Sequence, residues 1–136
     1  MRILIADDSA LIRERLIAEL AESGFFTVDQ AQTGDEAIEL FVAHKPDIVI
    51  LDINMPGKNG LEALTAIRSK SMSAVVAIYS SFDQPRFVAR CQQLGANAFF
   101  SKARDFQLLM VYIRDQQRIY KARTSSLADQ SSNLAN

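Results

Sequence analysis

Residues 48–52 read Ile48-Val49-Ile50-Leu51-Asp52, four large apolar residues followed directly by a carboxylate. The same pattern stands near the start of the chain, where Ile3-Leu4-Ile5-Ala6 precedes Asp7 and Asp8. Short apolar runs rich in Ile and Val are typical of strands buried on both faces of a parallel sheet. Ligands of such sheets bind just beyond the carboxyl ends of the strands. If these two strands are neighbours, we expect the three acids to share one pocket.

Three carboxylates in one small pocket repel one another, and a cation is the expected remedy. Ligation by oxygen atoms alone favours Mg²⁺ over Zn²⁺ or Cu²⁺. A carboxylate held beside Mg²⁺ is also equipped to attack a phosphoryl group. The pattern therefore predicts a magnesium site with phosphoryl chemistry.

Short apolar runs alternate with stretches of helical spacing along the rest of the chain. We expect strands over residues 2–6, 26–31, 48–51, 74–79 and 98–100. Helices are expected over residues 10–23, 33–45, 61–67 and 84–94, with a last one from about Asp105 into the Tyr120 region. Five β–α units in regular alternation predict a doubly wound (βα)5 three-layer sandwich of the α/β class, flavodoxin-like, with a central five-stranded parallel sheet.

The length of 136 residues fits one domain, which we expect over residues 1–123. Residues 124–136 hold few large apolar side chains, so we expect a polar C-terminal tail that is frayed or disordered. A formal net charge of −1 gives no general attraction to nucleic acid or to an anionic membrane. No apolar stretch approaches the roughly 18 residues that cross a bilayer. A strand pattern at the very start predicts no signal peptide and a cytoplasmic location.

Two further polar residues stand at predicted strand ends. Ser80 ends the fourth strand, and Lys102 follows the fifth. In an order that places the first strand between the third and the others, all these strand ends open on one crevice. Three acids, a hydroxyl and an ammonium suit phosphoryl transfer, which depends on positioning and charge stabilisation.

At this point the chain resembles the receiver domain of two-component response regulators, over roughly residues 2–120. The resemblance rests on several short motifs that occur in the family's order, each at a predicted strand end or loop. They are Asp7-Asp8, Asp52, Met55-Pro56 with Gly60, Ser80, Gly95-Ala96 and Lys102.

The resemblance implies that Asp52 is the phosphoacceptor for a sensor histidine kinase or a phosphotransfer protein. Mg²⁺ would be held by Asp8, Asp52 and the backbone carbonyl of Asn54, with indirect help from Asp7. Lys102 would pair with Asp52 at rest and with a phosphoryl oxygen after transfer.

Further roles follow from the same resemblance. Ser80 would hydrogen-bond the phosphoryl group, and Phe99 would be the aromatic switch residue that turns inward. A downstream protein would bind the face formed by the helix over 84–94, the strand over 98–100 and the last helix. The resemblance implies no enzyme, only a phosphoacceptor that assists its own phosphorylation and dephosphorylation. Whether phosphorylation also drives homodimerisation is left open.

Two positions depart from the family pattern. Ala103 follows Lys102 where the family usually has proline, so we expect a trans peptide bond and a shifted loop, since a cis non-proline bond costs about 3 kcal/mol. Phe82 is bulky for its place, and we hypothesise that it shields an acyl phosphate from water.

Simpler interpretations stand beside these roles. Asp7 and Asp8 could cap the first helix, Ser80 could be a turn residue, and Phe99 could be core packing. Arg13 and Arg15 are expected on a solvated face. Competing functions are a receiver that binds its partner without phosphorylation, a Mg²⁺-dependent phosphohydrolase with an aspartyl nucleophile, and a flavodoxin-like cofactor binder.

Overall fold

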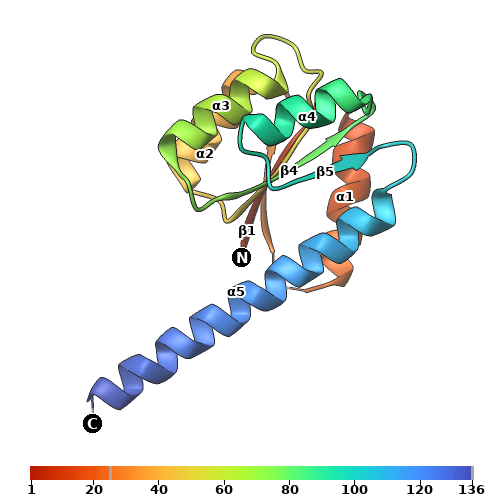
Figure 1. Cartoon of the computed structure of the whole chain (residues 1–136). Coiled ribbons are helices and arrows are strands. Elements are labelled where there is room, and N and C mark those ends of the chain that lie inside the picture. Colours follow the sequence, from red (N-terminus) through yellow and green to blue (C-terminus); the bar gives the residue numbers. More distant parts are fainter. Residues whose placement is uncertain (25, 136) are drawn as a thin grey trace.

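The computed structural model describes residues 1–24 and 26–135, with side chains up to residue 127. Five parallel strands form one sheet in the order β2-β1-β3-β4-β5. The strands are β1 (Arg2–Ala6), β2 (Thr27–Ala31), β3 (Ile48–Leu51), β4 (Val75–Ser80) and β5 (Ala98–Ser101). The helices are α1 (Ala10–Glu22), α2 (Gly34–His44), α3 (Gly60–Lys70), α4 (Pro85–Gln93) and α5 (Phe106–Ala135). The predicted doubly wound sandwich is confirmed (Figure 1).

The strand order differs from the expected one in one respect. Strand β3 lies between β1 and β4, whereas we expect the first strand between the third and the others. All four residues of β3 are buried. Its place in the middle of the sheet, covered on both faces, suits such a sequence. The adjacency of β1 and β3, on which the shared pocket depends, is as expected.

Alternate residues of each central strand enter two separate cores. In β3, Val49 and Leu51 belong to the core under α2, α3 and α4, and Ile48 and Ile50 belong to the core under α1 and α5. Figure 1 shows these helices on opposite faces of the sheet. Strands buried on both faces explain the near-continuous apolar runs in the sequence.

The helix ends follow from local chemistry. The hydroxyl oxygen of Thr33 accepts a hydrogen bond from the Glu36 backbone amide at 3.1 Å and caps α2. Gly24 follows α1 and Gly95 follows α4, both with positive φ, the left-handed conformation that glycine adopts readily. The predicted helix starts and stops therefore lie within a few residues of the observed ones, except at the end of α5.

Helix α5 continues to Ala135, about 15 residues beyond its expected end near Tyr120. Residues 124–135, expected as a frayed or disordered tail, are helical here; residue 136 lies outside the described residues. The reason is local, because residues 106–135 contain no glycine or proline to end the helix. The side chains of residues 121–127 are all exposed, so no core covers this part of the extension. A domain boundary after residue 123 stays a prediction.

Candidate functional site

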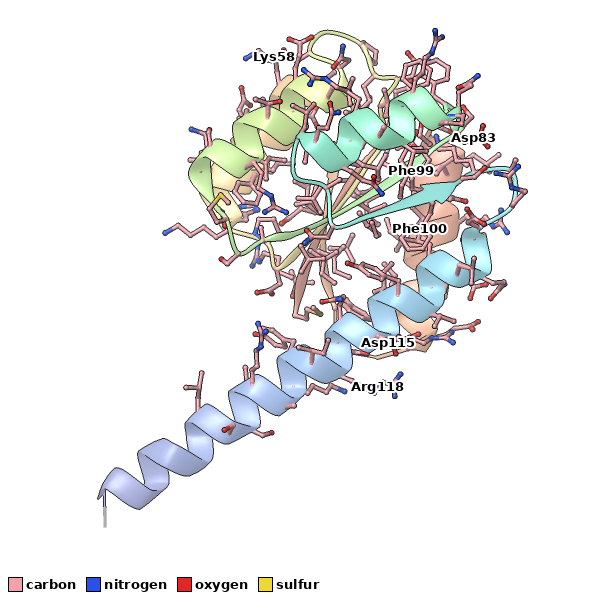
Figure 2. The ribbon with its side chains drawn as sticks, in the orientation of Figure 1. Lys58, Asp83, Phe99, Phe100, Asp115 and Arg118 are labelled. Atoms are coloured by element: carbon pink, nitrogen blue, oxygen red, sulfur yellow. The ribbon has the colours of Figure 1, made fainter. Side chains whose placement is uncertain are left out.

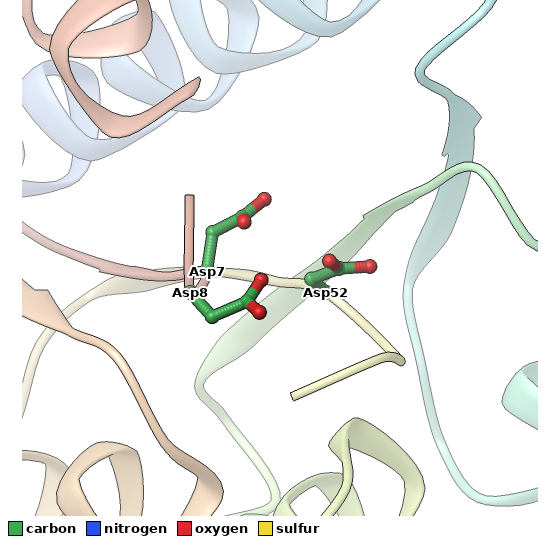
Figure 3. Close-up of side chains that lie close together, drawn as sticks. All are labelled: Asp7, Asp8 and Asp52. Atoms are coloured by element: carbon green, nitrogen blue, oxygen red, sulfur yellow. The ribbon is translucent and has the colours of Figure 1, made fainter. Parts of the chain in front are cut away.

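Three carboxyl groups meet at one end of the sheet. Asp7 follows β1 and Asp52 follows β3, and these strands are paired up to Ala6 and Leu51. Oxygen atoms of Asp7, Asp8 and Asp52 all lie within 4.8 Å of one another (Figure 3). Asp7 and Asp52 are buried, and Asp8 is exposed. The structure thus brings together the three acids that the sequence places at strand ends.

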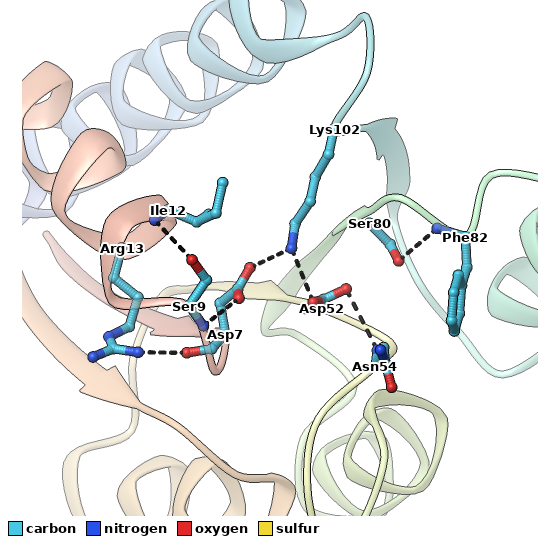
Figure 4. A network of polar contacts seen from close by, with 9 residues as sticks. All are labelled: Asp7, Ser9, Ile12, Arg13, Asp52, Asn54, Ser80, Phe82 and Lys102. Atoms are coloured by element: carbon cyan, nitrogen blue, oxygen red, sulfur yellow. Dashed lines mark hydrogen bonds and ion pairs between the residues drawn. The ribbon is translucent and has the colours of Figure 1, made fainter.

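Lys102 lies directly after β5 and reaches across the sheet to this cluster. Its ammonium nitrogen is 2.7 Å from Oδ2 of Asp7 and 2.9 Å from Oδ2 of Asp52 (Figure 4). The contact with Asp52 is the one expected at rest. The ion pair with Asp7 is an addition that sequence reasoning did not foresee.

The electrostatics of the cluster are governed by burial and by these contacts. Burial raises the pKa of Asp7, and the charge of Asp52 adds to the rise, against the opposing bonds from Lys102 and from the Ser9 amide. Burial alone would lower the pKa of Lys102, but its bonds to Asp7 and Asp52 outweigh burial and raise it. Lys102 therefore stays charged inside the cluster.

The donor set fits a divalent cation. Three carboxylates and one ammonium leave two formal negative charges, which one Mg²⁺ would balance. All the side-chain donors are oxygen atoms, the ligands that Mg²⁺ prefers. Receiver domains, the family that the sequence resembles, bind Mg²⁺ at an acidic pocket of this kind. Asn54 lies beside it, with its backbone amide 3.4 Å from Oδ1 of Asp52; its carbonyl as a ligand stays a prediction.

Ser80 ends β4 and is fully buried. Its hydroxyl oxygen accepts a hydrogen bond from the Phe82 amide at 3.1 Å (Figure 4). Its carbonyl accepts the Lys102 amide at 3.0 Å, so the two expected phosphate-contacting residues are joined through the backbone. Phe99 is partly buried against the core under α4. The switch roles of Ser80 and Phe99 stay predictions.

Phe82 and Ala103 mark the two departures from the family pattern. Phe82 is 37% exposed and stacks on Phe87, with ring centroids 5.5 Å apart. Its shielding role stays a hypothesis, which a Phe82→Ala variant that lost its acyl phosphate no faster would contradict. Every peptide bond among residues 1–24 and 26–135 is trans, as expected at Lys102–Ala103.

Gly60 has a role that its place in the motif did not explain. A Cβ atom on this residue would lie 2.0 Å from the carbonyl oxygen of Asp52. The first turn of α3 therefore packs directly against the backbone of Asp52, and only glycine permits this approach.

Arg13 was missed by sequence reasoning. It is expected on a solvated face, but it is 8% exposed and donates to the Asp7 carbonyl at 2.7 Å and to Oε1 of Gln30 at 3.0 Å. The expectation is wrong because Arg13 lies on the inward face of α1 with the buried Leu16 and Leu20. Its spacing of three and seven residues from these leucines is the signal that could have placed it there.

The model of the response regulator receiver domain matches residues 3–114 of the chain. The chain belongs to the response regulator receiver domain family. Among its relatives, the transcriptional regulatory protein PdtaR of Mycobacterium tuberculosis is 43% identical over 101 residues, which cover 74% of this chain and 49% of the relative. Chemotaxis protein CheY of Bacillus subtilis is 37% identical, covering 74% and 84%.

Solved structures agree with this assignment. The receiver resembles a chain in the CheX-CheY-BeF3-Mg²⁺ complex from Borrelia burgdorferi, with a TM-score of 0.76 and 31% identity over 83% of this chain and 89% of that chain. The expected family and fold are confirmed, and the receiver is homologous to two-component response regulators, consistent with a phosphorylation-dependent signalling switch. It spans about half the length of the PdtaR and NarL relatives. No helix in the described part of the receiver could span a membrane.

Proposed function

We propose that the receiver accepts a phosphoryl group on Asp52 from a sensor histidine kinase or a phosphotransfer protein and signals by protein–protein contact, in the cytoplasm. One observation carries the proposal: Asp52 is buried beside Asp7 and Asp8, with the Lys102 ammonium 2.9 Å from its carboxylate. A buried acid with a cation at contact distance is positioned both to attack phosphorus and to stabilise the charge that develops.

Different residues would bind the metal ion, accept the phosphoryl group and stabilise its charge. Asp8, Asp52 and the Asn54 carbonyl would hold Mg²⁺, with Asp7 acting indirectly. When bound, Mg²⁺ would supply charge neutralisation between the carboxylate and the phosphoryl oxygens. An oxygen of Asp52 forms the new bond to phosphorus while the bond to the donor nitrogen breaks. Lys102 moves from the carboxylate of Asp52 to a phosphoryl oxygen.

The readout depends on Ser80 and Phe99. The Ser80 hydroxyl lies at the carboxyl end of β4, where its oxygen accepts a hydrogen bond from the Phe82 amide. A phosphoryl oxygen would accept a hydrogen bond from the Ser80 hydroxyl, and the loop after β4 would move with that hydroxyl because the Phe82 amide is bonded to the same oxygen. Phe99 lies on β5 opposite Ile78 of β4. The face formed by α4, β5 and α5 is the proposed surface for a downstream protein.

The test compares the wild type with Asp52→Asn in Mg²⁺ and acetyl phosphate, by intact mass and size exclusion. We expect one phosphoryl adduct on the wild type, none on Asp52→Asn, and an unchanged adduct on the control variant Asp115→Asn on α5. Size exclusion shows whether the adduct also causes homodimerisation.

Two outcomes would contradict the proposal. Absence of an adduct on the wild type would favour a receiver that binds its partner without phosphorylation. Repeated turnover of a phosphomonoester would favour a phosphohydrolase.

A further inference from the structure

The loops that follow β4 and β5 are tied together by a partly buried hydrogen bond. Ser101, the last residue of β5, is 2% exposed, and its hydroxyl donates to Oδ2 of Asp83 at 2.7 Å. Asp83 belongs to the loop after β4 (Figure 2). A charge-assisted bond at this distance and burial is among the stronger side-chain contacts in proteins.

Ser101 also fixes the turn that follows it. Its hydroxyl oxygen accepts the Ala103 amide at 3.2 Å, and its backbone amide donates to Oδ2 of Asp105 at 2.9 Å. Its carbonyl accepts the Asp105 amide at 2.8 Å. The backbone on both sides of Lys102 is therefore held by bonds to one residue, in the place where proline is missing.

Asp83 connects this turn to Ser80. It is bonded to Ser101 and is 3.6 Å from the guanidinium of Arg104, which lies in the same turn. Its neighbour Phe82 donates its amide to the Ser80 hydroxyl. A continuous set of contacts thus runs from the Ser80 hydroxyl through Phe82 and Asp83 to the turn of Lys102.

We propose that Asp83 and Ser101 are positioning residues, which aim the Lys102 ammonium at the acid cluster and couple its turn to the loop of Ser80. The inference rests on the proposed function, because it assigns how the two phosphate-contacting residues are held. Loss of the bond loosens the turn, so the Lys102 ammonium would spend less time at the position where it can bind a phosphoryl oxygen. It would also spend less time between Asp7 and Asp52, where its charge competes with a metal ion.

Because Lys102 competes with the metal ion, a positioning role should change the affinities for Mg²⁺ and for beryllofluoride in different directions. A merely structural role would not separate the two affinities in this way. We would measure two affinities for the wild type, Ser101→Ala, Asp83→Ala and Asp83→Asn: that for Mg²⁺ alone, and that for beryllofluoride in saturating Mg²⁺. We expect both alanine variants to bind beryllofluoride about tenfold more weakly, as for loss of one charge-assisted hydrogen bond. The same variants should bind Mg²⁺ alone at least as tightly as the wild type. Asp83→Asn keeps an acceptor for Ser101 but loses the charge, so its beryllofluoride affinity should lie between those of the wild type and Asp83→Ala.

Other outcomes separate this inference from the proposed function. Unchanged beryllofluoride affinity in both alanine variants would overturn the positioning role. Equal weakening of both affinities, together with a lower melting temperature, would also overturn it, because that is general destabilisation of the fold. A wild-type chain that binds no beryllofluoride would instead overturn the proposed function, and with it the inference.

Discussion

Lys102 occupies the centre of the acid cluster, within 2.9 Å of both Asp7 and Asp52. A single ammonium cannot balance three carboxylates, two of which are buried. The unbalanced charge costs folding free energy, because buried like charges are poorly screened by water. The same excess charge is what makes the cluster suitable for a divalent cation. The unbalanced charge therefore lowers the stability of the metal-free chain and raises its affinity for a divalent cation.

Replacement of Asp7 tests this opposition. Its pKa is raised in the folded state above the ordinary value of 3.8, so the folded chain holds the proton more strongly than the unfolded chain. The contribution of Asp7 to the free energy of unfolding is therefore lost as the pH rises from 3.8 through the raised pKa. We expect Asp7→Asn to melt a few degrees higher than the wild type at pH 7 without metal.

The control and the pH dependence sharpen this test. Asp8→Asn, at an exposed carboxylate, should raise the melting temperature less. The advantage of Asp7→Asn should disappear below the ordinary pKa of 3.8. A melting temperature at pH 7 below that of the wild type would show that the Lys102 ion pair dominates instead.

Among the elements, α3 is joined to the end of the sheet opposite the acids by Arg68. Its guanidinium donates to the carbonyls of Ser71, Ala74 and Gly95 at 3.1, 2.6 and 2.9 Å, and to Oδ1 of Asn97 at 2.7 Å. These acceptors stand before β4 and before β5, so one side chain fixes the entry to both strands.

Arg68→Met should therefore destabilise the receiver. Several carbonyl acceptors lose a charged donor, and the expected loss is about 2–3 kcal/mol in the free energy of unfolding, measured by urea denaturation. Lys70→Met, at an exposed position of the same helix, serves as the control and should change stability by less than about 0.5 kcal/mol. Equal stability of the two variants would mean that water replaces the guanidinium without cost.

The elements themselves could be predicted because their signals are local. Apolar runs such as Ile48–Leu51 and the Thr33 cap of α2 each decide an element within a few residues of chain. Strand order could not be predicted with the same success, because it depends on which buried runs pair across the sheet. The end of α5 was predicted too early. The low apolar content after Tyr120 indicates that this segment is not buried, but an exposed segment can still be helical.

The site was predictable for a related reason. In a parallel sheet every strand ends at the same edge, so Asp7, Asp52, Ser80 and Lys102 were brought together by topology alone. Contacts between side chains from separate loops had no such signal. The ion pair of Lys102 with Asp7 and the bond between Asp83 and Ser101 depend on the path of two loops and on rotamers. Neither can be read from spacing along the chain.

At the scale of the whole molecule, α5 has two parts with different surroundings. Leu109 and Ile113 are fully buried in the core under α1 and α5, whereas residues 121–127 are exposed. The C-terminal part of α5 extends away from the sheet (Figure 1). An isolated helix of this length is marginal in water, because most helical stability in proteins comes from packing.

Hydrogen exchange should reveal the difference. We expect the backbone amides of residues 121–127 to exchange at least about 100-fold faster than those of residues 109–117, since exposed helix opens locally and buried helix opens only with the domain. The measurement is native-state exchange followed by NMR at low protein concentration. Equal protection of both parts would show that something covers the extension, and a rise in protection with concentration would identify a second copy.

The length of α5 also has a mechanical consequence. At 1.5 Å per residue, the part beyond Tyr120 projects about 22 Å from the domain. A tilt of about 5° where the helix rests on the sheet would carry its far end about 2 Å sideways, by the geometry of a rigid rod of that length. While it stays helical, the extension would therefore act as a lever arm, in which a small displacement at the domain becomes a larger one at the far end.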